Sequence, residues 1–301
     1  MFAPPPEITA VKATELPECY HNHGSKSDWL FGKRDPDLGS FLEGPIIDRD
    51  GSLVVADIPF GRIFRVSSDG AFSQIAAYDG EPNGLALAED GTIWITDHRN
   101  GLMTLDPRSG TVTPRLSRLR REGFKGLNDL LFGPDGTLYF TDQGQTGMHD
   151  PTGRVFALRT DGRVDLMLDT IPSPNGMALS PCGRTLYVSV TRANQVWRLP
   201  LHADGSTTKV NIFLHLSGGH TGPDGLTTDD QGNLYVCHSG LGVVWVFNEL
   251  GVPVGRINVP EGLDVTSACF GGPDGETLFI IESSQGGIYT VARKDIPGVA
   301  G

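Results

Sequence analysis

The sequence predicts an all-β fold, a six-bladed β-propeller with four-stranded blades, from a sixfold repeat and from the absence of helical patterning. A turn containing glycine, followed by a short β-rich run, recurs six times in the 301 residues. Successive turn glycines lie 40 to 49 residues apart, which is the length of one four-stranded blade. No segment keeps a helical period, which argues against a βαβ fold. The six runs are DGSLVVAD (50–57), DGTIWITD (90–97), DGTLYFTD (135–142), CGRTLYVS (182–189), QGNLYVCH (231–238) and DGETLFII (274–281).

Each repeat supplies four strands except the last. Asp-Gly between two hydrophobic runs predicts a hairpin, and a third and a fourth strand follow, as in GRIFRVSSDG (61–70) and RVDLMLDTI (163–171). The sixth repeat ends without a fourth strand, so residues 7–16, EITAVKATEL, are expected to supply it and close the ring. We expect one domain over 1–301, with the blades in 43–293 and the closing strand and an extension in 1–42.

A polar side chain occupies the same position in every repeat, eight residues before the turn glycine and at the start of the preceding strand. These residues are Glu43, Asn83, Asn128, Asn175, Asp224 and Ser267. Rotation relates equivalent positions in a closed ring, so the six side chains should converge on the axis at one height. The structural alternative is that Asn, Asp and Ser favour strand starts because they bond neighbouring backbone groups. For Asn83 and Ser267 the two interpretations have equal weight.

The polar ring predicts one divalent metal ion. We expect Glu43 and Asp224 to face each other across a narrow channel, where two carboxylates repel unless a cation lies between them. The ring contains oxygen donors and no His or Cys, which favours Ca²⁺, or Mg²⁺ and Mn²⁺, over structural Zn²⁺. Ca²⁺ is the first choice, and Mg²⁺, Mn²⁺, Zn²⁺ and Fe²⁺ are alternatives.

The charge and composition of the chain argue against some classes of binding partner. The net charge of −12 argues against a nucleic-acid or anionic-membrane surface, since either needs a basic face. No apolar run approaches the roughly 18 residues of a membrane span, and the N-terminus does not resemble a secretory signal. Four cysteines without metal-type spacing are expected to be free thiols of a cytoplasmic protein. The oligomeric state stays open.

From about residue 41 to residue 292 the chain resembles the gluconolactonase and senescence-marker-protein (regucalcin) family of propeller lactonases. The resemblance is strongest in LEGPIIDRDGSLVVAD, LNDLLFGPDGTLYFTD, SPNGMALSPCGRTLYVS and GPDGLTTDDQGNLYV. It implies a metal held by Glu43, by Asn175 of a PNG motif and by Asp224 of a PDG motif. It also implies that Asn128, in an ND motif, lies at or beside the metal and faces the substrate. The implied activity is hydrolysis of a small sugar-acid or related lactone to its hydroxy acid.

Two other functions stay open. The related diisopropyl fluorophosphatases use a similar Glu-Asn-Asn-Asp set, so the same site could hydrolyse an organophosphate or phosphofluoridate. A non-catalytic binding propeller is the other alternative, and it predicts an incomplete polar ring. One departure from the resemblance concerns the substrate: sugar-acid lactonases often place an Arg two residues before the ND asparagine, where this chain has Gly126 beside Lys125.

The expected mechanism combines the ion with one carboxylate. The metal would polarise the lactone carbonyl, and Asp224 would act as general base toward the attacking water, with an ion-activated water as the alternative base. Loops that follow the second strands emerge on the face where the inner strands begin, and should supply the substrate wall. The candidates for substrate contact are Asn83, Asn128, His98, Gln143, His149, Arg192, His238 and Ser267. His98 and His238 are included because they follow the repeated strand at matching positions, and the alternative for each rim residue is a solvated loop.

Two further segments carry hypotheses. The run RLSRLRREGFK (115–125) has five basic residues, which suit either a solvated surface or attraction of an anionic substrate. The extension CYHNHGSKSDWLFGKRD (19–35) is expected to fold over one end of the channel.

Overall fold

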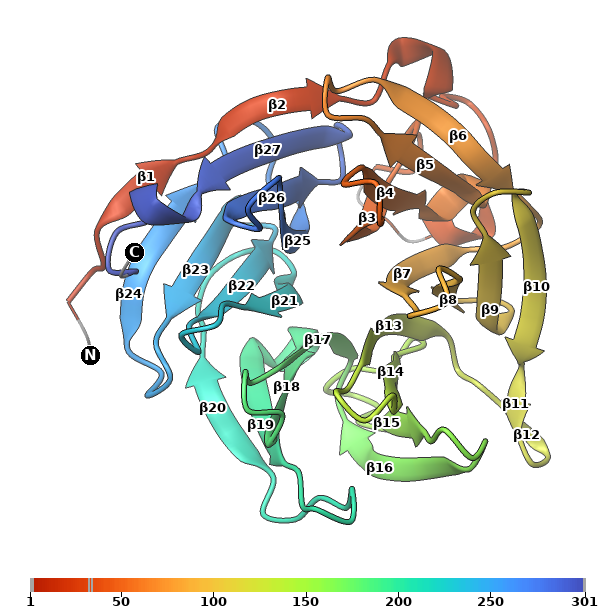
Figure 1. Ribbon diagram of the computed structural model, residues 1–301, viewed down its shortest axis with the longest axis vertical. Helices are drawn as coiled ribbons and strands as arrows, with labels where there is room; N and C mark the ends of the chain where they lie inside the picture. The colour runs from red at the N-terminus through yellow and green to blue at the C-terminus, as the bar shows by residue number, and fades with distance from the viewer. Residues whose placement is uncertain (1–2, 32, 34, 300–301) are drawn as a thin grey trace.

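Six sheets, five of four strands and one of five, surround a central axis in a computed structural model that describes residues 3–31, 33 and 35–299, which confirms the predicted six-bladed propeller (Figure 1). Blade 1 contains β3 (Leu42–Ile47), β4 (Leu53–Asp57), β5 (Arg62–Val66) and β6 (Phe72–Ala77). Blade 2 contains β7 (Pro82–Leu87), β8 (Ile93–Asp97), β9 (Gly101–Asp106) and β10 (Thr111–Leu116). Blade 3 contains β13 (Leu127–Phe132), β14 (Leu138–Asp142), β15 (Gly153–Leu158) and β16 (Val164–Ile171).

The second half of the ring repeats this order, with the innermost strand first in sequence. Blade 4 contains β17 (Pro174–Leu179), β18 (Thr185–Val190), β19 (Gln195–Pro200) and β20 (Asn211–His215). Blade 5 contains β21 (Gly222–Thr228), β22 (Leu234–Ser239), β23 (Val243–Phe247) and β24 (Pro253–Asn258). Blade 6 contains β25 (Val265–Gly271), β26 (Thr277–Glu282), β27 (Gly287–Ala292) and the N-terminal strand β2 (Val11–Glu15).

Only short helices and one small hairpin accompany the blades in the described part of the chain. The 3₁₀ helices are η1 (Glu18–Tyr20), η2 (Asp28–Leu30), η3 (Ile58–Phe60), η4 (Thr191–Ala193) and η5 (Arg293–Asp295). The hairpin is formed by β11 (Arg118–Leu119) and β12 (Glu122–Gly123). Within the described residues, no helix has the length and apolarity needed to cross a membrane.

The N-terminal segment closes the ring but does not form the single strand expected over 7–16. β2 pairs antiparallel with β27 and completes blade 6, as predicted. β1 (Glu7–Thr9) instead pairs parallel with β24 and adds a fifth strand to blade 5. Between them, Ala10 donates its N–H to Asn258 over 2.9 Å and is buried in the core shared by the two blades. The segment therefore crosses from the outer edge of blade 5 to that of blade 6 and covers both edges.

The hydrophobic core is divided into clusters that each lie between two neighbouring blades. Between blades 2 and 3, for example, Ala86 and Leu102 pack with Leu130, Phe140 and Phe156. The second strands are the most buried, and every residue of β4 and β14 is buried. Burial of both faces of each sheet holds the inner strands at fixed distances from the axis.

The inner strands also approach one another closely, because a glycine follows the polar residue in four blades. These glycines are Gly44, Gly84, Gly176 and Gly225. A Cβ added to Gly176 would lie 2.4 Å from the backbone oxygen of Asp224 and 2.5 Å from Cα of Gly225, in the next blade. The pairing of each inner strand with its second strand shifts register across the polar position, as between Pro174 and Met177. Such a bulge reorients a side chain, here toward the axis.

Gly176→Ala is therefore expected to destabilise the ring. The added methyl group meets backbone atoms, which cannot rotate away, so we expect a loss of about 1–3 kcal/mol in the free energy of unfolding, the usual cost of overpacking. Gly123→Ala is the matched control, because a Cβ there meets nothing within 4 Å. Urea unfolding of both variants measures the difference. Equal stability of the two variants would contradict this account of the inner-strand packing.

Candidate active site

The structure brings the six polar residues of the repeat together at the starts of the inner strands. Each is the second or third residue of its strand, and none is more than 9% exposed. The strands that carry them, β3, β7, β13, β17, β21 and β25, surround the axis in Figure 1. The residues thus form a buried polar ring, defined here as Glu43, Asn83, Asn128, Asn175, Asp224 and Ser267.

The two carboxylates of this ring do not face each other, contrary to the prediction. Opposite positions in six blades are three blades apart, so Asn175 of blade 4 is opposite Glu43 of blade 1. Asp224 belongs to blade 5, and only Ser267 of blade 6 separates it from Glu43; in Figure 1, β25 lies between β3 and β21. The ring therefore has an acidic side formed by blades 5, 6 and 1 and an amide side formed by blades 2, 3 and 4.

Burial governs the electrostatics of the acidic side. It raises the pKa of Glu43, although hydrogen bonds from the Ser267 hydroxyl and from the Gly44 N–H (2.9 Å) oppose this. Burial raises the pKa of Asp224 well above its ordinary range, and the charge of Glu43 adds to the effect. Two ionised carboxylates this close are costly unless a cation compensates them.

The donor set fits a hard divalent cation. The ring offers two carboxylates, three amide oxygens and one hydroxyl, which are the ligand types that Ca²⁺ and Mg²⁺ take. Among the described residues there is no group of three or more His, Cys, Asp or Glu side chains arranged to hold a metal. A site here would therefore use no more than two carboxylates and would depend on neutral amide oxygens.

A layer of buried acids, whose role was not predicted from the sequence, positions the ring. Asp57, Asp97, Asp142 and Glu282 end the second strands of blades 1, 2, 3 and 6 and have no exposed surface. Each accepts a backbone N–H from the segment that leads into the inner strand of its own blade: Phe41 to Asp57 (2.8 Å), Glu81 to Asp97 (2.9 Å), Lys125 to Asp142 (2.7 Å) and Asp264 to Glu282 (3.0 Å). The donors precede the ring residues by two or three positions. The signal was present, since three of the repeated runs end in Asp.

Hydroxyl groups fix neighbouring blades to one another at the same level. Thr96 of blade 2 donates to the backbone oxygen of Asn128 in blade 3 over 2.6 Å. Thr141 of blade 3 donates to that of Asn175 in blade 4 over 3.0 Å. Because these bonds hold the backbone of the ring residues, the side chains start from defined positions, as a preformed ligand site requires.

Asn128 is oriented by Gln143, a residue predicted for the substrate wall. The Asn128 amide nitrogen donates to Oε1 of Gln143 over 3.0 Å, and Nε2 of Gln143 donates to Oγ of Ser173 over 3.0 Å. With its nitrogen engaged by Gln143, Asn128 has its amide oxygen available to accept or to ligate. Gln143 is half-buried, so part of its side chain is open to solvent. We call the face where the inner strands begin the mouth.

His98 fills the space where the resemblance expects an arginine side chain. A Cβ on Gly126 would lie 2.4 to 2.7 Å from three atoms of the His98 ring, and Gly126 has φ of +146°. Burial lowers the pKa of His98, and the positive charge of Lys33 lowers it further. His98 therefore borders the site as a predominantly neutral imidazole.

The remaining rim candidates have different environments. His149 and Arg192 are exposed, and both lie beside Gly147 at the mouth. His238 has no exposed surface, and its Nδ1 accepts from Trp245 Nε1 over 3.2 Å, so its assignment to the substrate wall is wrong. Counted from the turn glycine, His238 aligns with Asp97 and not with His98.

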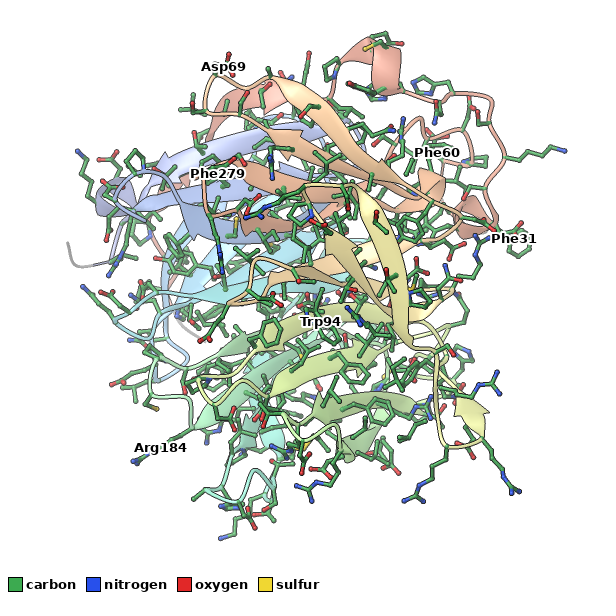
Figure 2. The ribbon with its side chains drawn as sticks, turned by 45° about the vertical axis from the view of Figure 1, so that its right-hand side comes forward. Phe31, Phe60, Asp69, Trp94, Arg184 and Phe279 are labelled. Atoms are coloured by element: carbon green, nitrogen blue, oxygen red, sulfur yellow. The ribbon has the colours of Figure 1, made fainter. Side chains whose placement is uncertain are left out.

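The two segments with separate hypotheses lie in different places. Figure 1 shows the β11–β12 hairpin, which carries the middle of the basic run, at the outer edge of the ring and far from the axis. Only Lys125, at the end of the run, approaches the ring, through its backbone bond to Asp142. The described part of the extension, residues 19–31, 33 and 35, lies at the mouth, where η2 packs against η3, and residues 32 and 34 are outside the described residues. Figure 2 shows Phe31 and Phe60 on this side and the turns of Asp69 and Arg184 on the other.

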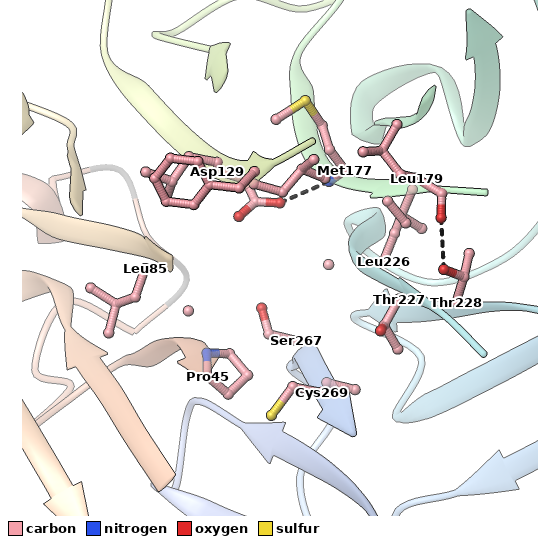
Figure 3. A pocket seen from close by; sticks show the side chains of 17 residues that line it. Pro45, Leu85, Asp129, Met177, Leu179, Leu226, Thr227, Thr228, Ser267 and Cys269 are labelled. Carbon is pink, nitrogen blue, oxygen red and sulfur yellow. Dashed lines mark hydrogen bonds between the residues drawn. The ribbon is translucent and has the colours of Figure 1, made fainter. Parts of the chain in front are cut away.

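Beyond the ring the channel continues as a cavity of about 340 Å³. Leu85, Leu226 and Cys269 are among its lining residues, and Asp129 reaches into it (Figure 3). Asp129 occupies the repeat position that is glycine in four other blades, and its Oδ2 accepts the Met177 N–H over 2.7 Å. Burial raises its pKa to about 7. Asp129 was missed because the ND motif was interpreted through its asparagine alone.

Comparisons with solved structures confirm the architecture. A gluconolactonase from Xanthomonas campestris superimposes with a TM-score of 0.75 at 24% identity, covering 97% of this chain and 99% of that one. A calcium-binding protein, regucalcin, from Agrobacterium tumefaciens has a TM-score of 0.72 at 24% identity, covering 87% of this chain and 92% of the other. At these identities the likeness shows the fold.

Sequence comparisons show the family as well as the fold. The chain is 31% identical over 272 residues to a gluconolactonase of Zymomonas mobilis, covering 80% of this chain and 76% of the relative. It is 32% identical over 236 residues to lactonase drp35 of Staphylococcus haemolyticus, covering 74% of this chain and 71% of the relative. Residues 41–284, which hold all six ring residues, match the model of the SMP-30/Gluconolactonase/LRE-like region. The chain belongs to this family.

Proposed function

We propose that the protein is a lactonase, a hydrolase that opens a small lactone to its hydroxy acid with the help of one divalent cation. The observation that carries the proposal is the buried polar ring, in which two carboxylates and three amides meet at the start of the inner strands. The matched relatives named gluconolactonase and lactonase support the reaction class.

Glu43, Asn175 and Asp224 are the proposed ligands, with Asn128 as a fourth ligand or a near neighbour. Ca²⁺ is the proposed ion, because a mixed set of carboxylate and amide oxygens suits its flexible coordination, and Mg²⁺, Mn²⁺, Zn²⁺ and Fe²⁺ are alternatives. A calcium-binding structural neighbour agrees with this choice. Compensation of the Glu43 and Asp224 charges is the physical reason for binding.

When bound, such an ion would polarise the lactone carbonyl and stabilise the negative charge that develops on its oxygen. Asp224 would accept a proton from the attacking water, since it is the ring carboxylate that accepts no hydrogen bond from Ser267. Asn128, oriented by Gln143, would present its amide oxygen to the substrate or the ion. The buried ring limits the access of bulk water to the reacting groups.

Removal and return of metal tests the proposal. Chelated protein should lose lactone hydrolysis in a pH-stat assay and regain it with one equivalent of Ca²⁺ per chain. An ion at 100 times its dissociation constant should also add about 2.7 kcal/mol to the free energy of unfolding, which raises the melting temperature by several degrees. If Ca²⁺, Mg²⁺, Mn²⁺ and Zn²⁺ all leave the melting temperature of chelated protein unchanged, the ring is not a metal site.

The same experiment separates the two alternatives from the sequence. A panel of lactones and organophosphates, assayed with the metal-loaded protein, should show faster turnover of lactones. Faster turnover of a phosphofluoridate would assign the site to organophosphate hydrolysis instead. Metal binding without turnover of either class would favour a non-catalytic binding propeller.

A further inference from the structure

Lys33, in the N-terminal extension, lies on an aromatic platform at the channel mouth. Its ammonium group is 3.6 Å from the centre of the Trp29 ring and 5.5 Å from that of Phe41. The two rings contact each other at 4.8 Å. The Phe41 N–H is bonded to buried Asp57, and Phe41 precedes Glu43 by two residues. Cation–π contact thus holds the amine close to the polar ring, on a part of the fold that is itself fixed.

Charged groups from several blades act on the Lys33 ammonium group. Protein atoms packed around the ammonium group lower its pKa to about 8, although the side chain is still accessible to solvent. The charges that act on it are those of Asp224, Arg192, Asp264 and Glu43. Lys33 in turn affects His98 and Glu81. These groups belong to blades 1, 2, 4 and 5 and to the loop before blade 6. They agree with the contact to Phe41, two residues before Glu43, which places the amine beside the ring.

Lys33 and Arg192 form a pair of unneutralised cations at this mouth. Each repels the other, and both are exposed to solvent. In the ranges 3–31, 33 and 35–299, neither has a carboxylate within ion-pair distance. A divalent ion on Glu43 and Asp224 would cancel those two charges. The two ring carboxylates would then no longer attract the amine, and of the charges that act on Lys33 those of Arg192 and Asp264 would remain.

We propose that Lys33 and Arg192 bind an anionic group of the substrate, so that the preferred lactones carry a carboxylate or a phosphate away from the ring ester. The inference rests on the proposed lactonase function and names its substrate class. It also accounts for Gly126: the cation that the resemblance expects there is absent, and His98 occupies its space. The extension would supply a cation from a different part of the chain.

A matched pair of substrates tests this directly. D-glucaro-γ-lactone and D-glucono-γ-lactone share a five-membered ring and differ in a carboxylate. The wild-type protein should have the lower KM for the glucarolactone. Lys33→Gln and Arg192→Gln should each raise that KM about 10-fold, as expected for loss of a charged hydrogen-bond partner, and should raise the KM for the gluconolactone by a clearly smaller factor. Lys26→Gln, in the same extension, is the control and should behave as wild type.

A second measurement does not depend on turnover. Lys33→Gln removes a positive charge near Glu43 and Asp224, so Ca²⁺ binding measured by calorimetry should become several-fold tighter than in Lys26→Gln. Glucarate should also bind the Ca²⁺-loaded wild-type protein more tightly than the Lys33→Gln variant. These two results stand even if no lactone is turned over, so failure of the lactonase proposal is distinguishable from failure of this one.

Three outcomes would overturn the inference. The first is a wild-type KM that is equal for the two lactones or lower for the neutral one. The second is an equal rise of both KM values in Lys33→Gln, which would indicate a structural role for the extension. The third is unchanged Ca²⁺ affinity in that variant, which would show that the amine does not lie near the ring carboxylates.

Discussion

Asp224→Asn is expected to lower kcat for lactone hydrolysis by about 10²–10⁴-fold at saturating metal, the usual range for loss of a general base. The substitution keeps an oxygen ligand of nearly the same shape and removes the negative charge together with the proton acceptor. The metal should still bind at high concentration, because the second carboxylate and the amide oxygens remain. The loss should therefore persist across a full metal titration.

Two comparison variants separate base from ligand. Asn175→Ala removes a neutral donor that water can replace, so added metal should restore part of the rate. Glu43→Gln removes charge from the other carboxylate without touching the proposed base, and should give an intermediate result. The measurement is lactone hydrolysis in a pH-stat over a metal titration for all three variants. Full rescue of Asp224→Asn by metal would assign Asp224 a purely ligating role.

Asp142→Ala should destabilise the protein strongly. Its carboxylate accepts from the Lys125 and Gly126 N–H groups (2.7 and 2.9 Å) and pairs with the Arg154 guanidinium, and it has no exposed surface. Removal leaves a mostly buried arginine charge without its main partner, which costs about 3–5 kcal/mol. Guanidinium unfolding should show the loss as a lower midpoint with an unchanged slope.

Matched variants test the cause of that loss. Asp161→Ala removes an exposed turn carboxylate from the same blade and should cost less than about 1 kcal/mol. The double variant Asp142→Ala/Arg154→Met should recover part of the loss, since no uncompensated charge remains. A single variant as stable as Asp161→Ala would mean that the buried acids do not hold the segments leading to the ring.

The repeat made most of the fold and the polar ring predictable. Glycine spacing gave the blade number, and equivalent positions in a closed ring had to converge on the axis. The repeat also contained the correct arrangement of the two carboxylates. Glu43 and Asp224 are in blades 1 and 5, and only blades three apart are opposite each other. The prediction that they face each other came from charge repulsion and ignored the blade order. His238 was aligned with His98, but in the repeat it corresponds to Asp97, one residue earlier. The structure shows His238 to be fully buried.

Other features could not be predicted from local patterns. The split of residues 7–16 between two blades depends on which outer edges the chain reaches, and strand periodicity is the same for either edge. Lys33 lies outside the repeat, so no equivalent position indicates that it approaches the ring. Its placement depends on tertiary packing of Trp29 against Phe41.

Metal content of the purified protein tests the central claim most directly. Protein prepared without chelator and analysed by plasma mass spectrometry should contain about one divalent ion per chain. The double variant Glu43→Gln/Asp224→Asn, shown to be folded by circular dichroism, should contain less than about a tenth of that amount, because both charges that compensate the ion are gone. Wild-type protein that neither contains nor takes up a divalent ion, or a double variant that retains a full equivalent, would contradict the account.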